Sequence, residues 1–121
     1  MNRLLIWCHD RGIQVEMIDG ISFFQWKEKL IGINSGVSKQ TQLFHLLHEC
    51  GHYLVWRSRH ERHKAGWGDP KLLETKLAVV DEELEAWYRG RRLAKRLGIK
   101  INARAWARCK AKNLRTYFAG T

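Results

Sequence analysis

The chain has 121 residues, 45% of them hydrophobic, and this size and composition favour one compact domain with a small core. No apolar run reaches the roughly 20 residues of a membrane-spanning helix, and the apolar stretch at the start is too short for a signal peptide. Three cysteines without a C-x-x-C pair argue against a disulfide framework. We therefore expect a soluble protein of the cytoplasm.

The net charge of +10 is unevenly distributed. Residues 1–88 carry 11 Lys/Arg and 12 Asp/Glu, whereas residues 89–121 carry 11 Lys/Arg and no acidic residue. We expect a single domain over residues 1–121, in which residues 89–121 form a basic helical C-terminal module. A basic surface of this kind is typical of proteins that bind nucleic acid or an acidic protein.

The first third of the chain predicts a short helix followed by a small sheet. The helix is expected over residues 2–10. The segments GIQVEMID, ISFFQW and KLIGIN have the composition and alternation of strands. Because Asp19-Gly20 is a hairpin-turn signal between the first two, we expect an antiparallel sheet of about three strands.

Three helices are expected after the sheet, over residues 39–57, 71–97 and 103–118, with a polar loop over residues 58–70. Ser38 and Asn102 are typical N-cap residues, and Gly98 suits the end of a helix. The expected fold class is therefore α+β, with the small sheet packed on the first two of these helices and a basic helix at the C-terminus.

The helix over residues 39–57 contains the motif His-Glu-Cys-Gly-His. His48 and His52 stand one turn apart on one face, so both imidazoles can bind one Zn²⁺ ion. Glu49 lies beside them and can act as a general base on water that zinc activates. Gly51 leaves room for another element to approach. The alternative is an ordinary helix with two surface histidines, because so short a pattern also arises by chance.

A catalytic zinc ion usually has three protein ligands, and the segment VVDEELEAWYRG offers carboxylates for the third position. We take the apolar stripe of this helix to be Leu73, Leu77, Val80, Leu84 and Trp87. Glu83 then lies at the border of the buried face, whereas Glu82 and Glu85 point to solvent. His63, in the expected loop, is the alternative third ligand. Candidates for substrate or oxyanion contacts are His45, Tyr53 and His63.

The basic module carries cations at helical spacing. On the late part of the long helix these are Arg89, Arg92 and Arg96, and on the last helix they are Arg104, Arg108, Lys112 and Arg115. Cations in such stripes can neutralise phosphates of a nucleic acid. The alternative is a solvated helix surface, and nothing in the pattern specifies recognition of a base sequence.

Two blocks of the sequence resemble the ImmA/IrrE family of HExxH metallopeptidases. KLIGINSGVSKQTQLFHLLHECGHYL is similar to that family's strand, linker and H-E-L-G-H helix, and EELEAWYRGRRLA is similar to its downstream E-x-E-A helix. The resemblance implies a zincin-type site with His48, His52 and Glu83 as zinc ligands and Glu49 as general base. It departs from the family at Cys50, where Leu is usual, and at Trp87, where Asn or Asp is typical.

The resemblance implies a zinc-dependent endopeptidase that cleaves a protein, such as a DNA-associated regulator. Family members often carry a helix-turn-helix domain, and the basic module stands in its place here. Short stand-alone chains of this kind resemble phage-encoded proteins, which act in the bacterial host cytoplasm. The alternative is a non-catalytic metal-binding protein whose basic helices bind nucleic acid or an acidic host protein. A protease of DNA–protein crosslinks, resembling the SprT group, would favour His63 as the ligand.

Overall fold

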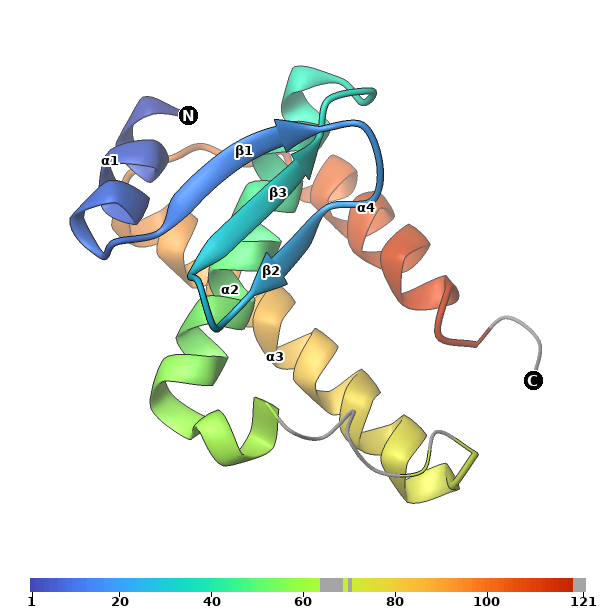
Figure 1. Cartoon of the computed structure of the whole chain (residues 1–121). Helices are drawn as coiled ribbons and strands as arrows, with labels where there is room; N and C mark the ends of the chain where they lie inside the picture. Colours follow the sequence, from blue (N-terminus) through green and yellow to red (C-terminus); the bar gives the residue numbers. More distant parts are fainter. Residues whose placement is uncertain (64–68, 70, 119–121) are drawn as a thin grey trace.

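The computed structural model describes residues 1–63, 69 and 71–118, apart from the side chains of residues 59–63. The fold is α+β, with a small mixed sheet lying against a central helix and further helices around it (Figure 1). In chain order the elements are α1 (Asn2–Asp10), β1 (Gln14–Ile18), β2 (Phe23–Gln25), β3 (Leu30–Asn34), α2 (Lys39–His63), α3 (Leu73–Arg96) and α4 (Ala103–Arg115).

The sheet is mixed, so the prediction of an antiparallel sheet is wrong for one of its two pairings. The strand order is β1-β3-β2, with β2 antiparallel to β3 and β1 parallel to it. The Ser22 hydroxyl accepts a hydrogen bond from the backbone N–H of Asn34 at 2.9 Å, so the β1–β2 connection passes the end of β3. Asp19-Gly20 therefore belongs to a crossover and not to a hairpin. The most buried strand is β3, and it takes the central position.

The helix caps follow the sequence prediction. The Ser38 hydroxyl accepts a hydrogen bond from the Thr41 N–H at 3.2 Å, and the Asn102 side chain accepts one from the Ala105 N–H at 2.9 Å. Gly98 has a φ of 70°, and the N–H of Ile99 bonds back to the carbonyl of Ala94. These local signals place the ends of three helices.

Two expectations about the long helices are wrong. Residues 58–63 continue α2, although their polar composition suggested a loop. On α3 the expected apolar stripe is largely exposed, with Leu73 at 67% and Leu77 at 55%. The buried residues of α3 are Glu83, Ala86, Trp87, Gly90, Leu93 and Ala94. Small side chains form much of the packed face, so a stripe of large apolar residues was a misleading guide to it.

The core surrounds α2, which packs against the sheet on one side and against α3 and α4 elsewhere. Cys8 of α1 and Cys50 of α2 are fully buried, and their sulfur atoms lie 3.5 Å apart as free thiols. Within the described part of the chain, no helix is both long and apolar enough to cross a membrane.

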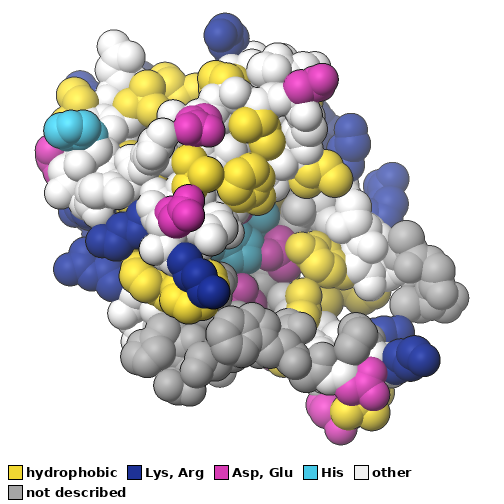
Figure 2. Space-filling model, viewed as in Figure 1, with side chains coloured by type: hydrophobic (Ala, Val, Ile, Leu, Met, Phe, Trp, Pro, Cys, Tyr) yellow, Lys and Arg dark blue, Asp and Glu magenta, His cyan; other side chains and the backbone are white. Residues whose placement is uncertain are grey.

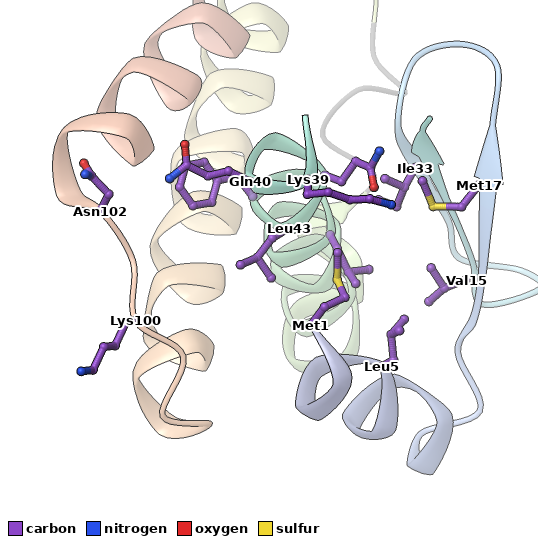
Figure 3. A pocket seen from close by; sticks show the side chains of 13 residues that line it. Met1, Leu5, Val15, Met17, Ile33, Lys39, Gln40, Leu43, Lys100 and Asn102 are labelled. Carbon is purple, nitrogen blue, oxygen red and sulfur yellow. The ribbon is translucent and has the colours of Figure 1, made fainter. Parts of the chain in front are cut away.

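An apolar groove of about 570 Å³ opens between α1, β1 and the first half of α2. Leu5 and Val15 point into it from α1 and β1, and Lys39 lines it at the start of α2 (Figure 3). This groove explains why Met17, which faces the same side of the sheet as Val15, is 52% exposed. Among the residues that the structure describes, it shares no lining residue with the pocket over the motif residues that is described below.

Candidate metal centre

The motif helix α2 and the helix α3 cross with their backbones in contact. A Cβ atom on Gly51 would clash with the backbone carbonyl of Ala86, and a Cβ atom on Gly90 would clash with the carbonyl of Leu47. The space that Gly51 was expected to leave is therefore filled by α3. Because Glu83 lies one turn before Ala86, this close crossing brings its carboxylate to the histidines of α2.

His48, His52 and Glu83 converge at the crossing. The carboxylate of Glu83 reaches both rings, with Oε1 3.1 Å from Nε2 of His48 and Oε2 2.6 Å from Nε2 of His52. The two Nε2 atoms lie 3.1 Å apart. All three side chains are buried, with residue exposures of 5%, 9% and 5%. Two imidazole nitrogens from α2 and the two carboxylate oxygens of Glu83 from α3 thus lie close together.

The ionisation of these groups is strongly coupled. Burial would lower the pKa of His52, but hydrogen bonds to Glu82 and Glu83 outweigh it and raise the pKa to about 10. Burial would raise the pKa of the Glu83 carboxyl, but hydrogen bonds to His48 and His52 hold it well below its usual range. Burial would also lower the pKa of His48, but hydrogen bonds to Glu49 and Glu83 outweigh burial and raise this pKa. Without a metal ion, the cluster therefore holds protons at neutral pH.

The donor set fits zinc, which commonly takes imidazole nitrogen and carboxylate oxygen. Ligand atoms around a tetrahedral zinc ion lie roughly 3.3 Å apart, because each bond is about 2.0–2.1 Å long. The two Nε2 atoms lie 3.1 Å apart, and each lies 3.1 or 2.6 Å from one of the two Glu83 oxygens, so these separations are close to this value. Ligand atoms of His48, Glu49 and His52 also lie within 4.8 Å of one another. Glu49 is therefore a further carboxylate beside these histidines.

Two carboxylates contact the second nitrogen of each ring. Glu49 Oε2 lies 3.3 Å from Nδ1 of His48, and Glu82 Oε2 lies 3.5 Å from Nδ1 of His52. Such partners fix the orientation of a ligating imidazole and leave Nε2 free for a metal. Glu82 was expected to point to solvent, and this is wrong because its side chain is only 15% exposed. Glu85, also expected to point to solvent, is half-buried and forms an ion pair with Arg89, which bonds to α2.

Trp87 packs directly on the cluster. Its ring stacks on the imidazole of His48 with centroids 4.2 Å apart and an angle of 12° between the planes. Its indole N–H donates a hydrogen bond of 2.9 Å to Asn113 on α4. Trp87 therefore fixes the His48 ring from one side and connects the cluster to the C-terminal helix, at the position where the ImmA/IrrE pattern has Asn or Asp.

A pocket of about 400 Å³ lies over the cluster. Figure 2 shows histidine and acidic side chains in a hollow that hydrophobic side chains surround. Residues 21–24 form one wall, and the other wall comes from the end of α4 and the turn after it, with Asn113, Thr116 and Tyr117. Tyr117 lines this pocket together with Glu83, and burial is the main cause that raises the pKa of its hydroxyl. The sequence analysis missed Tyr117, because only the chain path shows that the end of α4 returns to the motif.

The other candidate contact residues lie elsewhere. Nδ1 of His45 lies 2.8 Å from the hydroxyl of Ser22. Both residues line another groove, which adjoins the pocket over the cluster. Tyr53 is 3% exposed and packs edge-on against Trp7 and Phe24, so it belongs to the core and does not line the pocket over the cluster. The side chain of His63 lies outside the described residues, and His63 stays the alternative ligand.

The basic residues divide into two groups. Arg89 is half-buried and binds Glu85, the Leu54 carbonyl and the Ser58 hydroxyl, so it joins α3 to α2. The remaining candidates for nucleic-acid contact are exposed: Arg92, Arg96, Arg104, Arg108, Lys112 and Arg115. Trp106 packs in the core against Phe44 and Trp87, which leaves it unavailable for stacking on bases.

No protein-family model matches the sequence, and no curated protein or solved structure matches it either. The function must therefore be argued from the residues and their geometry.

Proposed function

We propose that this chain is a zinc-dependent metallo-endopeptidase that hydrolyses a peptide bond in a protein substrate. The observation that carries the proposal is the meeting of His48, His52 and Glu83 beside Glu49 at the floor of a pocket. A buried cluster of two imidazoles and two carboxylates is expensive to desolvate, and its position in a cleft favours a functional over a structural role.

His48, His52 and Glu83 would hold the ion through Nε2, Nε2 and a carboxylate oxygen. When bound, zinc supplies a Lewis acid that polarises the substrate carbonyl and lowers the pKa of water to about 7. Glu82 and Trp87 orient the two rings, since they contact Nδ1 of His52 and the face of His48.

Glu49 is the proton carrier in this proposal. Its carboxylate takes a proton from the attacking water and delivers it to the amine of the leaving fragment. The hydroxyl of Tyr117 lies at the same pocket and can donate a hydrogen bond to the oxygen of the scissile carbonyl as negative charge develops. The resemblance to the ImmA/IrrE family supports this assignment of roles and suggests a DNA-associated regulator as the substrate.

A second candidate function is favoured by the exposed cations of α4. Arg104, Arg108, Lys112 and Arg115 are all exposed, and residues 89–121 contain no acidic residue. In this candidate the metal is structural and the helix binds nucleic acid or an acidic protein. The two functions differ in their need for Glu49, because only peptide hydrolysis requires a general base.

The test is cleavage of a diverse peptide mixture by the zinc-loaded chain and by Glu49→Gln, with products identified by mass spectrometry. Wild type should cleave, whereas Glu49→Gln should keep its zinc and lose at least about a thousandfold in rate, since both proton transfers fail. Equal activity of the two proteins, or no cleavage by zinc-loaded wild type, would overturn the proposal.

A further inference from the structure

A second groove lies next to the pocket over the metal cluster. Its volume is about 480 Å³, and it runs between α4, the first half of α2 and the β1–β2 connection. The two hollows share four lining residues: Ile21, Ser22, Asn113 and Thr116. They therefore adjoin, and a polypeptide that occupies the first can continue into the second.

The charged residues of the second groove are all cations. Arg108 and Lys112 project from successive turns of α4, and no Asp or Glu is among the described residues that line it. The groove also contains a neutral polar pair: the Ser22 hydroxyl accepts from the Asn34 N–H and lies 2.8 Å from Nδ1 of His45. Burial lowers the pKa of His45, which keeps the ring uncharged at neutral pH.

The pocket over the cluster and the second groove together form one cleft, which has opposite charges at its two ends. Glu49, Glu82 and Glu83 gather at the metal end, and Arg108 and Lys112 stand at the other. A bound zinc ion offsets negative charge only at the first end. The second end attracts a carboxylate, whereas a lysine or arginine side chain placed there would be repelled.

We propose that the second groove is a substrate subsite that accepts an aspartate or glutamate side chain on one side of the scissile bond. This inference rests on the proposed peptidase function and adds the substrate class to it. Arg108 and Lys112 act as specificity residues that bind the carboxylate, while Ser22 and His45 offer neutral polar contacts deeper in the groove.

The test is the cleavage profile of a peptide library in which every position around the scissile bond varies. Zinc-loaded wild type should show Asp or Glu enriched about five- to tenfold at one fixed position, as expected for partly exposed ion pairs. The double variant Arg108→Glu/Lys112→Glu should lose this preference or favour Lys and Arg there. Arg104→Glu/Arg115→Glu is the matched control, because it changes the same charge on the same helix outside the groove. Circular dichroism and zinc content should be equal in all three proteins.

The outcomes separate the two proposals. Cleavage without an acidic preference in wild type, or the same preference in both double variants, would overturn the subsite and leave the peptidase intact. If wild type cleaves without an acidic preference, Arg108 and Lys112 remain candidates for contact with nucleic acid. Absence of any cleavage by zinc-loaded wild type would instead overturn the peptidase and the subsite together.

Discussion

Oε2 of Glu83 lies 2.6 Å from Nε2 of His52, which makes this contact the shortest of those within the cluster. The contact joins α3 to the motif helix within the candidate metal centre. The contact also keeps His52 protonated at neutral pH, because the pKa of His52 is raised to about 10 and that of Glu83 is held well below its usual range.

This pair predicts how the stability of the chelator-treated protein depends on pH. The raised pKa of His52 stabilises the fold below about pH 6.5, and this contribution is lost as the pH rises to about 10. The lowered pKa of Glu83 stabilises above about pH 4.5 and is lost as the pH falls. The cluster should therefore contribute most between about pH 4.5 and 6.5. Thermal unfolding over pH 4–10 measures the effect.

His52→Ala is the control for this pH dependence, because it removes the titrating pair and should reduce the alkaline loss of stability. Zinc-loaded protein should behave in the opposite way, with zinc affinity rising with pH because the ion needs neutral imidazoles. A melting temperature of the chelated wild type that stays constant from pH 6.5 to 10 would contradict the coupling of His52 to Glu83.

The helix crossing predicts a strong effect of an added methyl group. Gly51→Ala should push α3 away from α2, lower the free energy of unfolding by about 1–3 kcal/mol or more, and weaken zinc binding by displacing Glu83. Denaturant unfolding and zinc titration measure the two effects. Gly36→Ala is the control, since a Cβ atom there meets only the side chain of Asn34 at 3.2 Å. Equal zinc affinity in the two variants would exclude this role of the crossing.

Trp87 is predicted to position His48 for the metal. Trp87→Leu removes the stacked ring and should lower zinc affinity about ten- to hundredfold, as loss of a partner that orients a ligand commonly does. Trp106→Leu removes another buried tryptophan, one that contacts Trp87 and Phe44, and should cost stability while leaving zinc affinity closer to wild type. Competition with a chromophoric chelator measures both. An equal loss of zinc affinity in the two variants would exclude this positioning role of Trp87.

Tyr117 is predicted to assist the reaction and not the binding of zinc. Tyr117→Phe should retain zinc and lower kcat about ten- to a hundredfold, with KM changed little, because the lost hydrogen bond strengthens only as charge develops. Tyr88→Phe, which alters an exposed tyrosine of α3, should have wild-type kinetics. An unchanged kcat in Tyr117→Phe would remove Tyr117 from the mechanism.

The sequence predicted those features that depend on neighbouring residues. The caps at Ser38 and Asn102, the end of α3 at Gly98 and the shared face of His48 and His52 all follow from local rules. The position of β3 between β1 and β2 did not, because a turn signal such as Asp19-Gly20 does not show whether the chain reverses or crosses over. The return of Tyr117 to the cluster depends on long-range packing in the same way.

Glu83 was chosen from the sequence for a reason that the structure does not support. Its selection assumed that Leu73 and Leu77 face the core, but both are exposed, and Glu83 lies within the packed face and not at its border. The packed face of α3 depends on Ala86 and Gly90, whose small size permits the close approach of α2. A search for large apolar residues overlooks a contact of this kind.

The most direct test of the central claim is the zinc content of wild type, Glu49→Gln and Glu83→Ala, purified under reducing, chelator-free conditions and measured by elemental analysis. We expect about one zinc ion per chain in wild type and Glu49→Gln, since one ion satisfies the three ligands, and a clear loss of zinc in Glu83→Ala. Zinc retained in Glu83→Ala but lost in His63→Ala would make His63 the third ligand. A wild-type chain that binds no zinc even with excess metal would contradict the metal centre and the peptidase built on it.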